Sequence, residues 1–525
     1  MKYLSTIKVL FGNLFITDRS LRILRCEGVK RISKKVNSSG VILVESDQVF
    51  LNQIAQYYAS GPLMEFYSSK IVSYRMGNLN CWTPITARIR HFMSLANGFG
   101  SKKLVLVNGR PSSRAKLAAK ELLHSVQSKR DLECLSVSGI LIGDLIYDRF
   151  LSTHQSATID LESIEFRKSL EESLTYFFQW LDFFCKNEVK AICISHCVYH
   201  YAIPARVAIQ SDIPVYEITA GNIFKLDRSN LHAVVSHTAL KTAAEKGLAT
   251  NFQEVVSVGN REIENYLKPD DFKNPNLQAL HSNEISSDLE LELDPSKVTL
   301  LVATHLFYDA PHRFGIALFP DFFEWLDHLG QLSNKADYNW LIKAHPDLPL
   351  SKGSIIADVL SKYTGLKLVP PSTSHASLVQ AGVDFVLTVH GSVGFEFPLL
   401  GVPVIGANPN APYSNFGFSI SPKSVAEYDE LIIGLTNWSK FIERVEIESF
   451  FYARFVTQFD GWLLKNYSQF LQDVGGMNNS MSKKVLQYFV NNPEISSTSE
   501  LSQGLFQFFQ SGDSVIQRRH FRIEA

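Results

Sequence analysis

The residues with the clearest chemical potential lie in the stretch Val383–Ile405, which reads VDFVLTVHGSVGFEFPLLGVPVI. Its apolar, β-branched start predicts a buried parallel strand, and an apolar helix of about two turns follows after a short loop. The loop and the helix start contain His390, Gly391, Ser392, Gly394 and Glu396. The glycines let the backbone approach a ligand, the serine adds a donor, and a helix start offers free N–H groups to an anion. The glutamate is placed to accept hydrogen bonds from two ribose hydroxyls, so the stretch predicts a nucleotide site. An ordinary buried strand–helix turn with a solvated glutamate is the alternative.

A second set of polar residues follows the predicted strand Tyr338–Lys343. Lys343 ends the strand, and His345 comes directly before Pro346. Because parallel strands present their carboxyl ends at one edge of a sheet, we expect both side chains near the loop that contains Ser392. A cationic lysine and a histidine donor would there stabilise the negative charge that develops on a leaving phosphate. Taken singly, each is also typical of a surface loop.

A third set follows the predicted strand Val298–Ala303 in the segment THLFYDAPHRFG. It consists of His305, Asp309, His312 and Arg313. An arginine and two histidines at the end of a strand are suitable partners for an anion. The two histidines and the aspartate leave a metal site open as the alternative interpretation.

Two of these motifs resemble those of a known class of enzymes. Residues 390–406, HGSVGFEFPLLGVPVIG, resemble the sugar-nucleotide loop in the C-terminal domain of GT-B glycosyltransferases. Residues 340–346, WLIKAHP, resemble the Lys-x-His-Pro motif of bacterial GT-B enzymes that use CMP-activated acidic sugars. Those enzymes include capsular Kdo transferases and bacterial sialyl- and polysialyltransferases. The resemblance is confined to residues 340–406.

The resemblance implies an α/β protein of the GT-B type, with two Rossmann-like domains facing across a cleft. It implies transfer of a sugar, Kdo or another CMP-activated acidic sugar, from a nucleotide donor to a surface polysaccharide or lipid-linked glycan. Lys343, His345, Arg313 and Ser392 would hold phosphate, and Glu396 the ribose. His305, Asp309, His312 and His390 would border the same donor site. No metal and no cofactor besides the donor is expected, because GT-B enzymes generally hold the leaving group with side chains and helix ends.

In such enzymes the catalytic base comes from a loop of the N-terminal domain. The candidates here are Asp144, which follows the apolar run in SGILIGDLIYD, and His196, which follows the predicted strand Val189–Ile194. Either would accept the proton of the acceptor hydroxyl. The acidic doublet followed by glycine that often supplies the base in sialyltransferases is missing, which leaves Kdo-type and other sugars open.

The length of 525 residues predicts more than one domain. We expect an N-terminal Rossmann-like acceptor domain (1–267), a linker (268–296), a nucleotide-sugar-binding domain (297–440), a helix returning to the N-domain (441–475) and a tail (476–525). The long helix of the returning segment is predicted at Phe441–Leu464. Strands of the first domain are predicted at Gly40–Val44, Lys103–Val107, Val189–Ile194, Ile213–Ile218, Leu231–Val235 and Val255–Val258.

Composition bears on nucleic-acid binding, disulfide bonding and membrane insertion. A formal net charge of -1 gives no indication of nucleic-acid binding, and six cysteines without a CxxC pair indicate reduced thiols. No apolar run is long enough to span a bilayer and no signal peptide is apparent, so we expect a cytoplasmic protein. Lysine and arginine alternate with apolar residues in the first 35 residues, which would suit contact with the inner face of the cell membrane; a solvated basic face is the alternative.

Two other functions stay open at this stage. One is an epimerase resembling the non-hydrolysing UDP-GlcNAc 2-epimerases, which share the serine/glycine–glutamate loop and the two-domain fold. The other is a non-catalytic GT-B-like module that binds glycan or scaffolds an assembly complex. Polar residues that recur at predicted strand ends, such as Lys343 and Ser392, favour an enzyme over this module.

Overall fold

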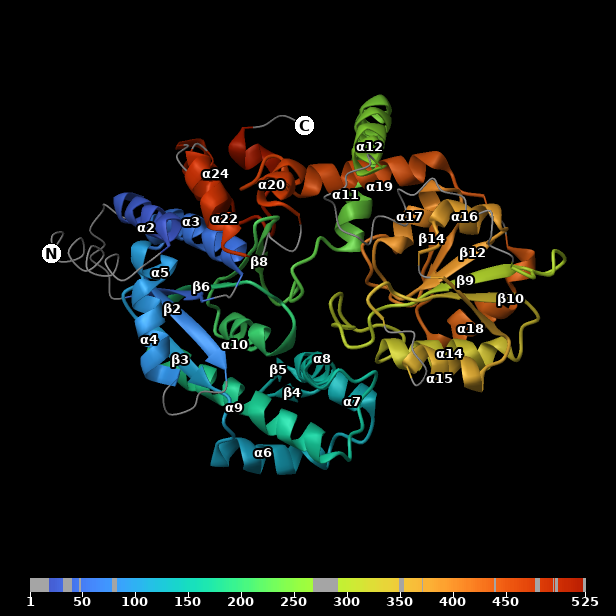
Figure 1. The fold of residues 1–525 in the computed structure, drawn as a ribbon, viewed down its shortest axis with the longest axis horizontal. Coiled ribbons are helices and arrows are strands. Elements are labelled where there is room, and N and C mark those ends of the chain that lie inside the picture. Colours follow the sequence, from blue (N-terminus) through green and yellow to red (C-terminus); the bar gives the residue numbers. More distant parts are fainter. Residues whose placement is uncertain are drawn as a thin grey trace.

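The structure is a computed structural model of the chain. It describes residues 18–31, 40–46, 49–77, 83–267, 291–348, 354–370, 372–438, 441–476, 482–493, 495 and 499–522. Its two main sheets lie side by side, one in an N-domain and one in a C-domain (Figure 1).

The N-domain is built on a six-stranded sheet with the order β3-β2-β1-β6-β7-β8. Its strands are β1 (Val41–Glu45), β2 (Lys70–Gly77), β3 (Leu104–Asn108), β6 (Val189–Ile194), β7 (Val215–Ile218) and β8 (Ile223–Leu226). All neighbours are parallel except β7 and β8. Successive residues of β1 enter opposite cores, because Leu43 packs on one face of the sheet and Ile42 and Val44 on the other. The strand order reverses between β1 and β6.

The C-domain is built on a second six-stranded sheet with the order β11-β10-β9-β12-β13-β14. Its strands are β9 (Thr299–Ala303), β10 (Asn339–Lys343), β11 (Leu366–Val369), β12 (Phe385–Thr388), β13 (Val404–Gly406) and β14 (Ser419–Ile420). Every neighbouring pair is parallel. This is the order 3-2-1-4-5-6 of doubly wound nucleotide-binding sheets, and it reverses between β9 and β12.

Helices cover both faces of each sheet. Those of the N-domain are α2 (Arg19–Arg31), α3 (Phe50–Phe66), α4 (Thr83–Met93), α5 (Leu95–Gly98), α6 (Ser113–Leu123), α7 (Lys129–Glu133), α8 (Gly143–His154), α9 (Ile164–Lys186) and α10 (Ile203–Gln210). Those of the C-domain are α14 (Phe322–Ser333), α15 (Ile355–Lys362), α16 (His375–Gln380), α17 (Val393–Leu399) and α18 (Val425–Ile433). The last part of the chain adds α20 (Tyr467–Val474), α22 (Lys484–Asn491) and α24 (Ser499–Ser511), which share an apolar core with α3.

Three further helices join the domains: α11 (His237–Thr250), α12 (Phe252–Leu267) and α19 (Arg444–Thr457). Figure 1 shows α19 above the C-domain sheet, with the chain running on towards α20 at the N-domain. Helix α19 packs closely on α12, since a side-chain Cβ at Gly259 would lie 2.3 Å from the carbonyl oxygen of Glu448. Phe450 and Phe451 of α19 share a core with Leu240 and Ile263. The chain thus returns from the C-domain to the N-domain along α19.

The structure corrects some of the predicted elements. Val255–Val258 was expected as a strand but lies within helix α12, and Leu231–Val235 forms no strand. Strands β2 and β8 were missed. The helix predicted at Phe441–Leu464 is shorter, because α19 ends at Thr457.

Two α/β sheets of Rossmann type, one parallel throughout and one parallel except for β8, confirm the predicted GT-B fold class. The expected domain boundaries stay predictions, and residues 268–290 of the expected linker lie outside the described part of the chain. Within the described residues, no helix combines the length and the apolar character needed to cross a bilayer. Much of the basic N-terminal segment is likewise outside them, but Arg25 of α2 is buried, so it is not available to a membrane surface.

Candidate functional site

The predicted site residues of the C-domain converge where its strand order reverses. His305 follows β9 and His390 follows β12, and these two strands are neighbours. Their rings lie 4.9 Å apart between centroids. Ligands of open α/β sheets bind at such a switch point, outside the carboxyl ends of the strands. We call this place the C-switch.

His305 holds the loop of the C-switch together. Its Nε2 atom accepts hydrogen bonds from the backbone N–H groups of Val389 (3.2 Å) and His390 (3.4 Å). Its ring stacks on Phe322 at 4.3 Å. Burial, and then the neighbouring His390 and His345, lower the pKa of His305 well below its usual value. It is therefore a neutral acceptor that shapes the loop.

His390 is also neutral at physiological pH. Burial lowers its pKa to about 4, and the cationic neighbours Arg313 and His312 act in the same direction against Asp309. The Nδ1 atom of His390 is buried and has no hydrogen-bond partner among the described residues. A buried polar atom without a partner is costly, so this nitrogen is suited to a ligand atom.

The two glycines of the loop have different roles. Gly391 has a φ of +101°, a conformation that favours glycine, and it allows the chain to turn from β12 into α17. Gly394 makes room for a neighbouring ring, because a Cβ there would lie 2.0 Å from the Cζ atom of Tyr413. Close approach to a ligand is therefore open to Gly391 and not to Gly394.

Lys343 and His345 lie at the end of β10, beside the C-switch. The ammonium group of Lys343 donates to the carbonyl oxygen of Thr373 at 2.7 Å, and burial lowers the pKa of Lys343 to about 8. The backbone N–H of His345 donates to the hydroxyl of Thr304 at 3.1 Å. Burial lowers the pKa of His345, opposed by Asp347 and Asp309. At neutral pH this strand end therefore carries one cation, the lysine, and one neutral imidazole.

Glu396 lies beneath the loop and is not exposed to solvent. Its side chain is 1% exposed, and its Oε1 atom accepts a hydrogen bond of 2.7 Å from the hydroxyl of Tyr266 in α12. Burial raises the pKa of Glu396, offset in part by hydrogen bonds from Tyr266 and Ser392. In this arrangement the carboxylate fixes the serine and the tyrosine. A contact with ribose stays a prediction, and it requires the tyrosine to move aside.

His312 was expected to face an anion, but the structure places it between two carboxylates. Its Nδ1 atom lies 2.5 Å from Asp148 of α8, and its Nε2 atom lies 2.8 Å from Glu133 of α7. Burial opposes the charge, but the two carboxylates outweigh it and raise the pKa of His312 to about 10. Burial also raises the pKa of Asp148, to about 6. We call Glu133, Asp148 and His312 the latch, because the two carboxylates belong to the N-domain and the imidazolium to the C-domain.

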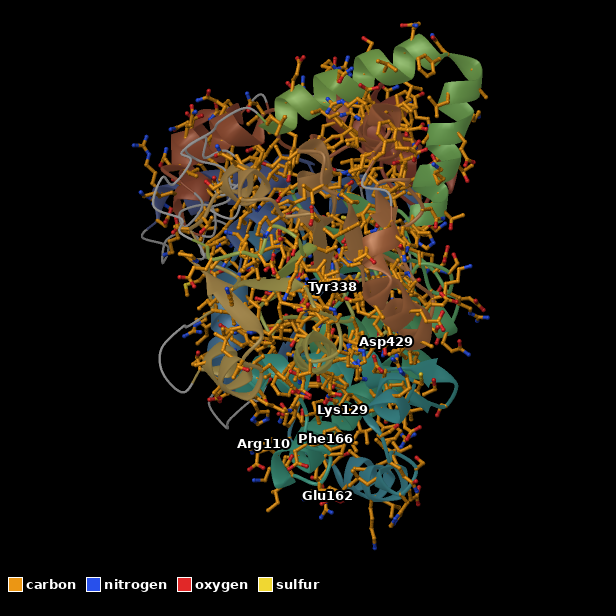
Figure 2. The ribbon with its side chains drawn as sticks, turned by 90° about the vertical axis from the view of Figure 1, so that its right-hand side faces the viewer. Arg110, Lys129, Glu162, Phe166, Tyr338 and Asp429 are labelled. Carbon is orange, nitrogen blue, oxygen red and sulfur yellow. The ribbon has the colours of Figure 1, made fainter. Side chains whose placement is uncertain are left out.

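Further contacts surround the latch. The hydroxyls of Tyr147 and Thr158 each donate to Asp321 at 2.6 Å. Lys129 pairs with Glu324 across the same boundary, and in Figure 2 it lies between Asp429 of the C-domain and Phe166 of the N-domain. These contacts hold the carboxyl edges of the two sheets towards each other.

Arg313 and Asp309 also bridge the domains. Arg313 donates to the carbonyl oxygens of His232 and Ala233. The hydroxyl of Tyr199, in the loop that follows β6, donates to Asp309 at 2.7 Å. The loop after β9 therefore faces the loop after β6, which contains one of the candidate bases.

That candidate base, His196, is part of a three-residue chain of hydrogen bonds. Glu45 ends β1 and is 6% exposed; it accepts from the backbone N–H (2.7 Å) and the hydroxyl (2.8 Å) of Ser195, at the end of β6. The same hydroxyl lies 2.7 Å from Nδ1 of His196, whose side chain is exposed. Strands β1 and β6 flank the point where the order of the first sheet reverses, which we call the N-switch.

The chain of hydrogen bonds decides which nitrogen of His196 carries the proton. A carboxylate accepts hydrogen bonds, so the hydroxyl of Ser195 donates to Glu45. The imidazole must then donate from Nδ1 to the serine oxygen, which places the lone pair of the neutral ring on Nε2. His196 is therefore set up as a proton acceptor.

Asp144, the other candidate base, lies in the interior. It is 2% exposed and its Oδ2 atom accepts from Arg206 at 2.6 Å, in a buried ion pair of the N-domain. A substrate hydroxyl would have to displace this pair. The geometry favours His196 over Asp144.

A pocket of about 330 Å³ lies where the domains meet. Residues of the N-domain, the loop at Arg313, the loop of the C-switch and helix α19 all contribute to its wall. They are Asn222, Phe224, Ala233, Val234, Val235, Leu240, Arg313, Phe314, Gly391, Ser392, Phe395, Pro412, Tyr413, Phe450, Arg454 and Gln458. The predicted phosphate loop thus opens directly into a cavity shared by both domains.

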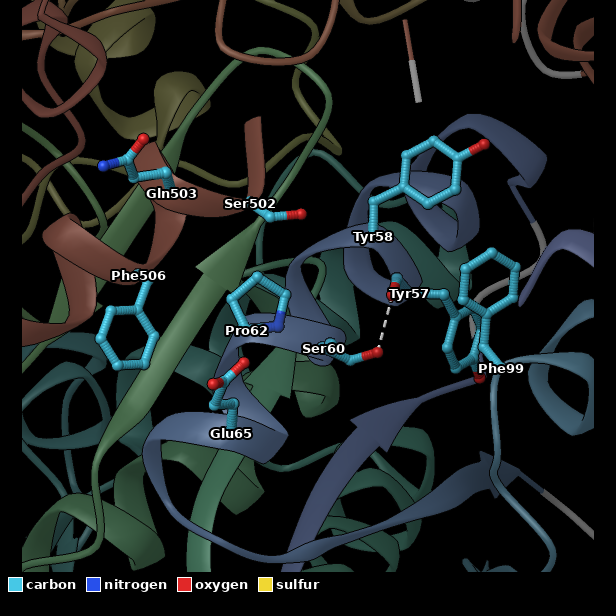
Figure 3. Close-up of a pocket in the computed structure, with 10 residues that line it drawn as sticks. Tyr57, Tyr58, Ser60, Pro62, Glu65, Phe99, Ser502, Gln503 and Phe506 are labelled. Carbon is cyan, nitrogen blue, oxygen red and sulfur yellow. Dashed lines mark hydrogen bonds between the residues drawn. The ribbon is translucent and has the colours of Figure 1, made fainter. Parts of the chain in front are cut away.

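A second pocket, of about 310 Å³, lies between α3 and α24 (Figure 3). Tyr58, Pro62, Glu65 and Phe506 are among its wall residues. None of the predicted site residues lines this second pocket.

Three residues that matter at these sites were not predicted from the sequence: Glu45, Tyr266 and Arg454. A carboxylate at the end of the apolar run VILVE was a visible signal for Glu45. Tyr266 and Arg454 gave no such signal, because their positions depend on how α12 and α19 pack against the C-domain. Within the described residues, no three His, Cys, Asp or Glu side chains are grouped so as to hold a metal ion.

No protein-family model matches the sequence, and no curated protein sequence matches it. Similar solved structures include the β-Kdo 2,4 transferase KpsC of Thermosulfurimonas dismutans (12% identity, TM-score 0.28), which covers 52% of this chain and 85% of that one. They also include the MnaA–UDP complex of S. aureus (10% identity, TM-score 0.25, 87% of this chain and 96% of that one). A third is UGT89C1 of Arabidopsis thaliana in complex with UDP (12% identity, TM-score 0.24, 87% of this chain and 100% of that one). Because all three TM-scores are low, the fold assignment rests on the two sheets themselves.

Proposed function

We propose that the protein is a glycosyltransferase that transfers a sugar from a nucleotide donor to a glycan acceptor. One observation carries this proposal: the switch points of two Rossmann-type sheets face each other, joined by the hydrogen bond between Tyr199 and Asp309. One switch point contains an exposed imidazole, His196, and the other a glycine–serine loop, Gly391-Ser392, at the start of a helix. A transferase needs both at one junction, whereas a module that only binds glycan needs neither.

The donor is proposed to bind in the pocket at the C-switch. Its phosphate would contact Ser392 and the backbone at Gly391, with Lys343 supplying positive charge from the neighbouring strand end. Charge that develops on the leaving phosphate is stabilised by donors that are already in place. The Lys-x-His-Pro motif favours a CMP-activated acidic sugar as the donor.

His196 is proposed to take the proton of the acceptor hydroxyl. Glu45 and Ser195 would hold the imidazole in the tautomer with its proton on Nδ1 and its lone pair on Nε2. As the proton arrives, the ring becomes cationic, and the buried carboxylate of Glu45 stabilises that charge through the serine. Glu45 is in this view a positioning residue, and His196 the catalytic one.

The donor site is tested by thermal stabilisation with CMP, CDP, UDP, GDP and their common sugar conjugates. A ligand present at 100 times its dissociation constant adds about 2.7 kcal/mol of stability, which is a readily measured shift. We expect a response to CMP that is lost in Lys343→Met and in Glu396→Ala, and that weakens above pH 8 as Lys343, with a pKa of about 8, loses its charge.

The matched control is Lys362→Met, because Lys362 lies on the surface and pairs with Asp327 at 2.7 Å, away from the pocket. It is expected to keep the full response. A response to UDP-GlcNAc in place of CMP would contradict the CMP preference and favour hexosaminyl transfer or the epimerase. No response to any nucleotide would contradict the proposed function.

A further inference from the structure

The wall of the pocket between the domains has a one-sided charge. It contains two arginines, Arg313 and Arg454, and no aspartate or glutamate. The chain as a whole is nearly neutral, with a formal net charge of -1. A cavity lined by cations alone raises the local concentration of anions and selects an anionic ligand.

The two arginines differ in what already occupies their N–H groups. Arg313 donates to the carbonyl oxygens of His232 and Ala233, and so serves the contact between the domains. Arg454, in α19, lies 5.3 Å from the ring centroid of Phe395 and 5.8 Å from that of Phe450. Stacking uses the face of a guanidinium and leaves the N–H donors at its edge available. Within the part of the chain that the structure describes, no carboxylate pairs with Arg454.

Phe395 also places Arg454 close to the predicted phosphate loop. It belongs to the first turn of α17, directly after Gly391-Ser392, and all of these residues line the same pocket. A planar guanidinium with free edge donors matches the geometry of a phosphate or carboxylate group.

We propose that Arg454 binds an oxyanion of the ligand in this pocket, so that the returning helix α19 completes the donor site. The identity of the ligand in this inference rests on the proposed function, whereas its negative charge follows from the two arginines of the pocket wall. The oxyanion is either a phosphate of the nucleotide or the carboxylate of an acidic sugar. Because Arg454 belongs to the helix that joins the domains, ligand binding is coupled to how α19 packs on the C-domain.

The test is calorimetric titration of wild type and Arg454→Gln with inorganic pyrophosphate, CMP, cytidine, UDP and CMP-N-acetylneuraminate. A lost hydrogen bond to a charged group corresponds to about 10-fold to 100-fold weaker binding. We expect a loss of this size for pyrophosphate and the nucleotides, and no change for cytidine. If only CMP-N-acetylneuraminate is weakened, the arginine binds the carboxylate; if CMP is weakened equally, it binds phosphate.

Arg261→Gln is the matched control. Arg261 also stacks on a phenylalanine, Phe455 at 4.7 Å, but it lies outside the pocket wall, so its loss is expected to leave binding unchanged. Equal thermal unfolding of the two variants shows that both are folded.

The outcomes separate this inference from the proposed function. Binding of every compound, CMP-N-acetylneuraminate included, that is the same in wild type and Arg454→Gln would overturn the inference and leave the proposed function intact. Pyrophosphate binding that depends on Arg454, without binding of any nucleotide, would support the inference and contradict the proposed function. Absence of binding of all five compounds to wild type would overturn both.

Discussion

The two switch points of this molecule occupy equivalent places in two similar sheets, yet they carry opposite chemistry. At the N-switch a buried carboxylate, Glu45, acts through Ser195 on His196. At the C-switch, no carboxylate among the described residues forms an ion pair with His305 or His390, and burial keeps both histidines neutral beside Lys343. The first arrangement suits taking up a proton, and the second suits holding an anion. The two sheets place the histidines at equivalent positions, and the residues that pack against each histidine determine its protonation state.

The latch provides the contrast that explains this division. His312 is buried and belongs to the same loop as the half-buried His305, but two carboxylates give it a pKa of about 10. Burial alone therefore makes a histidine neutral, whereas burial between carboxylates makes it a cation. The following predictions use this difference, beginning with the largest effect.

Replacing His312 by asparagine is expected to lower the free energy of unfolding by about 3–5 kcal/mol, because two buried carboxylates lose their cation. The folded pKa of about 10 lies above the unfolded value of 6.5, so the stabilisation is complete below pH 6.5 and is lost as the pH rises towards 10. Urea denaturation at several pH values measures this. The difference between wild type and variant should shrink across that window.

His328→Asn serves as the control for the latch. His328 pairs with Asp429 at 2.6 Å at a partly exposed site, where an ion pair contributes about 0–1 kcal/mol. If His312→Asn costs no more than this control, or if its effect does not depend on pH between 6.5 and 10, the latch is not a buried ion pair.

Replacing His390 by glutamine is expected to change how the free energy of unfolding depends on pH below 6.5. Its folded pKa of about 4 lies below the unfolded value of 6.5, so the unfolded state binds more protons and wild type loses stability as the pH falls from 6.5 to 4. A neutral side chain removes this loss, which is on the order of 3 kcal/mol. The same denaturation series measures it, with the exposed His124→Gln as the control. If His390→Gln loses as much stability as wild type between pH 6.5 and 4, His390 is charged in the folded protein.

Most of the buried parallel strands could be predicted from the sequence, but short apolar runs that belong to helices could not be told apart from them. Fully buried parallel strands are continuous apolar runs, so β9, β10 and β12 were located from the sequence to within one or two residues. The run Val255–Val258 has the same local appearance, but it is the buried side of an amphipathic helix, with Val255, Val258 and Ile263 on one face. A short apolar run does not distinguish the two cases.

The candidate site was predictable where it depends on strand ends and not where it depends on distant partners. His305, Lys343 and His390 were found because each follows a predicted strand. The latch role of His312 was missed, because Asp148 and Glu133 lie 164 and 179 residues away in the sequence. Arg454 was missed for the same reason, since only the packing of α19 brings it to the pocket.

The most direct measurement is ¹⁵N nuclear magnetic resonance of the histidine rings at pH 7, in protein labelled at histidine and assigned with single variants. We predict that His312 is doubly protonated, that His390 is neutral, and that Nδ1 of His196 carries a proton. We further predict that Glu45→Gln disturbs the ring signals of His196 and leaves those of His312 unchanged. A His196 ring protonated at Nε2 alone, or a neutral His312, would contradict the division of chemistry between the two switch points and the latch.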